Sequence, residues 1–163
     1  MSTRSRWIRW GVTLAVGMGV VGTVWVPPVV DEPTRSVIMQ AFSGLCHQLP
    51  ARSFHVDGVP LAVCDRCLGI YSGVLLGVLL MPLVLTKARW LHRNAGLALA
   101  AALVPLAIDW VGPVIGGWSN VPLSRIATGA VFGTAAGLLV AYAIVSAGRR
   151  AADSAASPSD RSP

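Results

Sequence analysis

The chain has 163 residues, of which 54% are hydrophobic and only 12% are charged. Soluble domains carry about 25% charged residues, so this composition excludes an ordinary soluble protein. Its abundant apolar side chains also exclude a disordered chain. The net charge is +6, but the basic residues flank apolar runs instead of forming a water-exposed surface, so we expect no binding to nucleic acid.

Four long apolar runs predict four membrane-spanning helices, because roughly 20 such residues cross the hydrocarbon core as a helix. The predicted spans cover approximately residues 8–30, 67–86, 94–116 and 122–148. The expected fold is therefore an all-α integral membrane protein, with a single four-helix domain over residues 1–150. A structured outward loop, residues 31–66, joins the first two helices, and residues 151–163 are expected to form a disordered cytoplasmic tail.

The first apolar run also has features of a secretory signal peptide, because Arg4, Arg6 and Arg9 precede it. Signal cores are only about 7 to 15 residues long and end at a small-residue cleavage site. The run is longer and lacks such a site, so the sequence favours an uncleaved first helix.

Basic residues also predict the orientation of the helices, since the short cytoplasmic segments of membrane proteins are enriched in Lys and Arg. Most of the 13 basic residues lie before the first span, between the second and third spans, or after the fourth. We therefore expect a multi-pass protein of the cell inner membrane, in contact with membrane lipid, with both termini cytoplasmic and residues 31–66 outside.

Glycine recurs at every fourth position in two of the predicted spans. The glycines are Gly69, Gly73 and Gly77 in the second span, and Gly129, Gly133 and Gly137 in the fourth. Small residues at this spacing let another backbone approach closely, which is a main source of helix association in lipid. Although glycine is common in membrane helices, the repeated spacing favours a packing role.

Asp109 is the one carboxylate inside a predicted span. Counting about 1.5 Å per residue from the outward helix ends places Asp109 and Arg125 at similar depth. We expect them to be neighbours, either as a buried ion pair that fixes helix register or as part of a functional site. Arg66 is expected to project along the glycine-lined face of the second span.

The outward loop is expected to contain two short structured elements. Residues 33–45 place apolar side chains at helical spacing, which predicts an amphipathic helix. Residues 53–63 alternate around the turn dipeptide Asp57-Gly58, which favours a small hairpin. The hairpin would carry the chain from Cys46 back to Cys64.

All three cysteines of the chain lie in or beside this loop. The spacing of Cys64 and Cys67 suits either a metal chelate or a redox pair. Cys46, with His47 or His55, would complete a tetrahedral site for zinc or another transition metal. The alternatives are a structural disulfide, or a buried Cys46 beside a hydrogen-bonded His47. The spacing leaves these interpretations open.

Several blocks of this sequence resemble a family of small prokaryotic membrane proteins known as domain of unknown function 2085. The blocks are Cys46-His47-Gln48, Arg52-Ser53-Phe54, Cys64-x-Arg66-Cys67-x-Gly69-Ile70-Tyr71-x-Gly73, Asp109 and Arg125-x-x-Thr128-Gly129. The resemblance covers about residues 42–137 and implies a polytopic membrane protein with no assigned activity. It also implies that the positions to test are Cys46, His47, Gln48, Arg52, Cys64, Arg66, Cys67, Asp109 and Arg125.

Three functions compete. The first is a metal-dependent membrane enzyme that acts on an anionic headgroup or phosphate. Its metal ligands would be Cys46, His47, Cys64 and Cys67, and its catalytic residues Arg52, Arg66, Asp109 and Arg125. The second is a thiol–disulfide oxidoreductase between a periplasmic partner and a quinone, similar to the disulfide-forming membrane oxidases but without a second cysteine pair. The third is a non-catalytic assembly or transport accessory that docks a periplasmic or membrane protein. The sequence predicts no particular oligomeric state.

Overall fold

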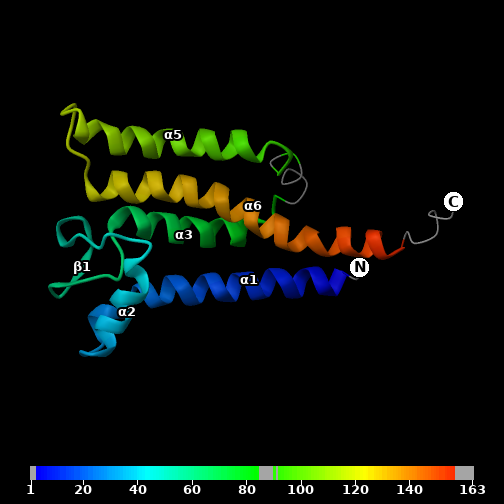
Figure 1. The fold of residues 1–163 in the computed structure, drawn as a ribbon, viewed down its shortest axis with the longest axis horizontal. Helices are drawn as coiled ribbons and strands as arrows, with labels where there is room; N and C mark the ends of the chain where they lie inside the picture. The colour runs from blue at the N-terminus through cyan, green and yellow to red at the C-terminus, as the bar shows by residue number, and fades with distance from the viewer. Residues whose placement is uncertain (1–2, 85–89, 91, 157–163) are drawn as a thin grey trace.

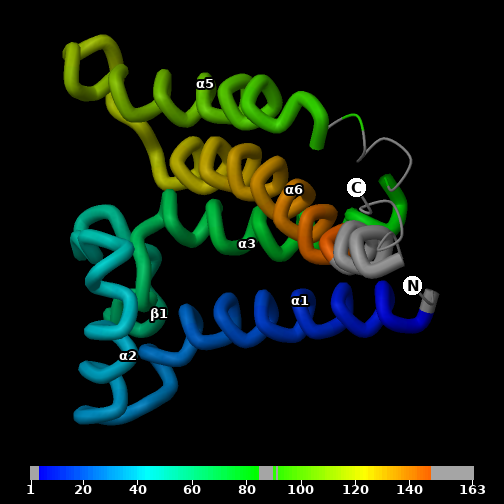
Figure 2. The backbone as a smooth tube through the Cα atoms, turned by 45° about the vertical axis from the view of Figure 1, so that its right-hand side comes forward, coloured from blue at the N-terminus to red at the C-terminus, as the bar shows by residue number. Residues whose placement is uncertain are grey.

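The computed structural model describes residues 3–84, 90 and 92–156. Long helices lie side by side and dominate the fold (Figure 1). They are α1 (Thr3–Val24), α3 (Asp65–Leu80), α5 (Ala95–Val114) and α6 (Pro122–Ala156). Figure 2 shows α3 and α6 between α1 and α5. The short elements of the loop gather at one end of the helices, opposite the end where α1 begins and α6 finishes.

Three helices of the described chain are long and apolar enough to cross a membrane: Arg4–Val24, Ala95–Val114 and Pro122–Ala147. The prediction of four such helices is therefore not confirmed. The remaining long helix, α3, has 16 residues, which reach only about 24 Å at about 1.5 Å per residue. Helix α3 ends just before Pro82. Proline cannot donate a backbone hydrogen bond and disfavours helical geometry in the residue before it. The end of the predicted second span, residues 85–86, lies outside the described residues.

Other helix boundaries also differ from the predicted ones. Helix α1 stops at Val24, and Pro27–Val29 forms a separate 3-10 turn. At the other end of the chain, α6 continues through Ala156, inside the segment expected to be disordered. Alanine is the strongest helix former, and four of residues 151–156 are alanine.

Helices α3 and α6 are packed backbone to backbone through their glycines. A Cβ atom added to Gly73 would overlap the backbone of Ala130, and one added to Gly133 would overlap the backbone of Ile70. The other four glycines of the two sets are in equally close contact with the facing helix. The predicted packing role is therefore confirmed, and the two glycine faces are opposed to each other.

The loop between α1 and α3 contains both of the short elements predicted for it, a helix and a hairpin. The amphipathic helix is α2 (Thr34–Ser43), and the hairpin pairs β1 (His55–Val56) with β2 (Val59–Pro60). Asp57 and Gly58 connect the strands with φ angles of 50° and 79°, the left-handed geometry that a tight two-residue hairpin requires. A further 3-10 turn covers Pro50–Arg52.

The segment after the hairpin attaches the loop to the helices. Leu61, Ala62 and Val63 are completely buried against Val24 at the end of α1. The backbone N–H of Ala62 also donates to the Val24 carbonyl oxygen at 3.1 Å. Burying these side chains removes apolar surface from water and sets the point at which the chain enters α3.

Candidate functional site

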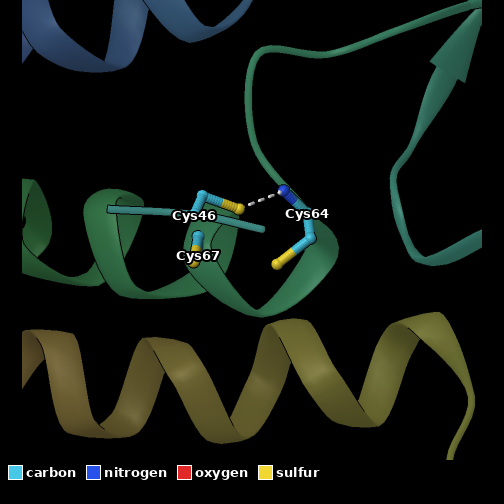
Figure 3. Close-up of side chains that lie close together, drawn as sticks. All are labelled: Cys46, Cys64 and Cys67. Carbon is cyan, nitrogen blue, oxygen red and sulfur yellow. Dashed lines mark hydrogen bonds between the residues drawn. The ribbon is translucent and has the colours of Figure 1, made fainter. Parts of the chain in front are cut away.

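Three sulfur atoms meet where the loop between α1 and α3 joins α3. The Sγ atoms of Cys46, Cys64 and Cys67 all lie within 4.8 Å of one another (Figure 3). Cys64 precedes the first residue of α3 and Cys67 lies in its first turn, so one helical turn brings them together. Cys46 comes from the loop after α2 and is 4% exposed. The predicted convergence of the three cysteines is confirmed.

Backbone N–H groups surround the Cys46 sulfur. The amide of Cys64 donates to it at 3.2 Å, as Figure 3 shows, and the amide of Gln48 donates at 3.4 Å. Such donors stabilise negative charge on sulfur, as outer partners of metal ligands do. Hydrogen bonds from the Cys46 and Cys67 thiols also hold the pKa of the Cys64 thiol far below its usual range.

Gln48 holds the loop that carries Cys46. Its side-chain amide donates to the carbonyl oxygens of Met39 and Ala62, both at 2.7 Å. Its φ of 47° turns the chain sharply after Cys46. Gln48 thereby connects α2 to the buried segment before α3, and we assign it a positioning role.

Neither histidine joins the sulfur cluster. Within the described chain, the cluster contains only the three cysteines. His47 is exposed because Cys46, its neighbour, is turned into the core, although His47 does line the adjoining cavity. His55 lies on the exposed side of β1, where its Nδ1 is 2.8 Å from the Ser53 carbonyl oxygen. The prediction of a fourth histidine ligand thus lacks geometric support.

A cavity of about 450 Å³ adjoins the sulfur atoms. It brings together the three cysteines and three predicted basic residues, Arg52, Arg66 and Arg125. Its remaining lining is His47 and the apolar side chains Leu45, Leu49, Ile70 and Trp110. Soft sulfur ligands and guanidinium groups therefore share one chamber, an arrangement suited to a metal ion and an anionic ligand.

Asp109 is paired with a residue of the cavity wall, but this partner differs from the one expected. Its Oδ2 accepts a hydrogen bond from Arg66 Nη2 at 2.6 Å, whereas Arg125 pairs with Asp65 at 3.3 Å. The prediction of a direct ion pair between Asp109 and Arg125 is therefore wrong. The first turn of α3 supplies both an acid and a base at this depth, so each of the expected partners pairs with α3 instead.

Asn120 and Ser124 connect the two ion pairs. The Asn120 side chain donates to Asp109 Oδ2 at 3.3 Å and accepts from Arg125 Nε at 2.9 Å. Ser124 donates to Asp109 Oδ1 at 2.6 Å. Asp109 and Arg125 are thus neighbours within one buried polar network.

Sequence reasoning missed Asp65, Asn120 and Ser124. Asp65 is not among the predicted site residues, yet it is 2% exposed and one of its carboxylate oxygens has no partner in the described structure. Its position between Cys64 and Arg66 was the available signal. For Asn120 and Ser124, the signal was a pair of polar residues four apart, directly before Arg125.

Comparisons with known proteins agree with the membrane character. A family model described as "Predicted membrane protein (DUF2085)" matches residues 46–139, which contain the cysteines, Asp109, Arg125 and both glycine sets. The chain is 38% identical over 92 residues to the uncharacterized protein MJ1492 of Methanocaldococcus jannaschii. That alignment covers 56% of this chain and 58% of the relative's length. No solved structure matches.

Proposed function

The chain belongs to the family of predicted membrane proteins described as DUF2085, and we propose that this membrane protein holds a transition metal on Cys46, Cys64 and Cys67. The observation that carries the proposal is the approach of three Sγ atoms to within 4.8 Å. Thiolates are preferred ligands of zinc and other soft transition metals. The N–H donors to Cys46 support the same proposal. We take zinc as the metal.

The proposed topology has four spans, with α3 in the second. Its support is the position of α3 between α1 and α6 (Figure 2) and its glycine packing. The proposal treats residues 1–150 as one domain of the inner membrane, with both termini cytoplasmic. The metal site then lies at the outward, extracytoplasmic end, where the sparse basic residues predicted the outside.

Three protein ligands would leave a fourth position on a tetrahedral zinc for water or substrate. The ligands line the cavity that also contains Arg52, Arg66 and Arg125. Arginine recognises carboxylates and phosphates with paired hydrogen bonds, and a metal lowers the pKa of its bound water. We therefore propose an enzyme that acts on an anionic headgroup or phosphate, with Asp109 orienting Arg66. His47, at the cavity wall, is the candidate for a fourth ligand if the position is closed.

Metal analysis of the purified protein tests this proposal. We expect about one zinc per chain, and less than a tenth of that in Cys64→Ser, because removing one of three thiolates opens the chelate. His55→Ala is the matched control and should keep its metal, since His55 lies outside the cluster. Inductively coupled plasma mass spectrometry measures the content.

Two results are decisive for the metal. No metal above background in the unaltered protein would remove the proposal. Loss of metal in His47→Ala, equal to that in Cys64→Ser, would overturn the open fourth position and make His47 a ligand.

A second candidate is a thiol–disulfide oxidoreductase coupled to quinone. The observation that favours it is three free thiols whose Sγ atoms lie within 4.8 Å of one another, one of which has a lowered pKa. A thiolate at neutral pH is the nucleophile of disulfide exchange. Thiol titration of denatured protein, purified without and with reductant, separates the candidates. Three thiols in both samples exclude a cycling disulfide, whereas one thiol rising to three would favour it over the metal centre.

A further inference from the structure

Arg52 differs from the other two arginines of the cavity. Arg66 and Arg125 are each neutralised by a carboxylate. Arg52 is exposed, and no side-chain partner is seen for it within the described residues. An uncompensated guanidinium on a cavity wall attracts anions more strongly than one already paired. Arg52 is therefore the anion-attracting group of this chamber.

A smaller cavity of about 110 Å³ continues from the first. The two share Arg52, Arg66 and Trp110, and the smaller one extends to Pro113, Val114 and Asn120. Asp109 engages Nη2 of Arg66, while Nε of Arg66 has no partner in the described structure. The shared wall therefore combines an arginine without a carboxylate partner, Arg52, an arginine already paired with Asp109, Arg66, and the indole ring of Trp110.

The rim of this double cavity is apolar. Leu45 is 75% exposed, Trp110 is 57% exposed and Val114 is 70% exposed. Trp110 and Val114 lie near the end of α5, which is apolar enough to cross a membrane, so the rim adjoins the region that lipid chains would occupy. An anionic amphiphile fits both the arginines and the apolar rim of the double cavity, because its anionic group reaches the arginines while its chains cover the rim.

We propose that the double cavity binds the phosphate group of an anionic membrane lipid, with Arg52 as its main anchor and Arg66 as the second. The proposal deepens the function proposed above by naming the substrate class, and it rests on the anionic-substrate part of that function. Lipid capture at this site does not require the metal, so the two can fail separately.

Native mass spectrometry of the full chain in detergent micelles tests the proposal. The probe is dioleoyl phosphatidic acid. Dioleoylglycerol has the same chains without the phosphate, and glycerol 3-phosphate has the phosphate without the chains. We expect stoichiometric binding of phosphatidic acid, little binding of dioleoylglycerol, and no displacement by an equal concentration of glycerol 3-phosphate. Metal content is measured in the same samples.

Arg52→Ala should weaken binding of phosphatidic acid about tenfold, because a charge-assisted, two-point contact is lost. Arg52→Lys should recover part of this loss, since lysine keeps the charge without the planar fork. Arg93→Ala is the matched control. Arg93 is an exposed arginine two residues before the start of α5, and α5 starts at the end of the helices opposite the loop (Figure 1), so its removal should leave binding unchanged.

Three results would overturn the proposal. Equal binding by Arg52→Ala and the unaltered protein would place the anion elsewhere. Equal binding of dioleoylglycerol would remove phosphate recognition. Full displacement by glycerol 3-phosphate would identify a soluble anion as the ligand. Metal-free protein that binds phosphatidic acid normally would support this inference and contradict only the metal proposal.

Discussion

Gly73→Ala is expected to destabilise the protein by about 3 kcal/mol, although alanine favours a helix over glycine by about 1 kcal/mol. The added Cβ would enter the backbone of α6 at Ala130. Backbone atoms cannot move aside as a flexible side chain can, so α3 and α6 would have to separate. Separation would also loosen every contact along their shared face, including those that hold Arg66 and Arg125 beside the cavity.

Gly19→Ala is the matched control for this prediction. Gly19 lies in α1, and nothing lies within 4 Å of the Cβ it would gain. Alanine should therefore stabilise at position 19 through helix propensity, so the two substitutions should shift stability in opposite directions. The midpoint of thermal unfolding in detergent measures both. A rise in the midpoint for Gly73→Ala would contradict the backbone contact between α3 and α6.

Periodic features of the sequence predicted most of the fold. The apolar runs located α1, α5 and α6, and the Asp57-Gly58 dipeptide located the hairpin, because each signal is local. The glycine spacing identified two packing faces but not that they face each other, since spacing along one helix carries no information about its partner. The end of α3 was placed too late because hydropathy continues past Pro82, whereas the helix does not.

The candidate site was predicted in its composition and only partly in its geometry. The number and spacing of the cysteines predicted that Cys46 lies beside Cys64 and Cys67, because few other residues of the loop can bind a transition metal. The direction in which His47 points depends on the turn at Gln48. That turn requires a positive φ at Gln48, which the sequence pattern does not predict. Depth counting placed Asp109 and Arg125 at similar depth and therefore selected Arg125 as the neighbour of Asp109, whereas the ion pair of Asp109 is with Arg66.

The pairing of Asp109 gives the other large expected effect. Asp109 is 6% exposed and pairs with Arg66 at 2.6 Å. Asp109→Asn keeps the shape of the side chain but leaves the guanidinium of Arg66 without its counter-charge. Breaking one partner of a buried pair costs about 3 to 5 kcal/mol, so we expect a loss of about 3 kcal/mol in the free energy of unfolding, measured by denaturant titration.

The double variants distinguish the observed pairing from the one expected from depth alone. Arg66→Gln should recover most of the stability lost in Asp109→Asn, because two neutral amides then face each other and no charge is left unpaired. Arg125→Gln should add to the loss, because it removes the partner of Asp65. In the Asp109→Asn background, the two second substitutions should therefore change the free energy of unfolding in opposite directions. Recovery by Arg125→Gln and not by Arg66→Gln would mean that Asp109 pairs across α5 and α6, and that α3 does not contribute the base beneath the cavity.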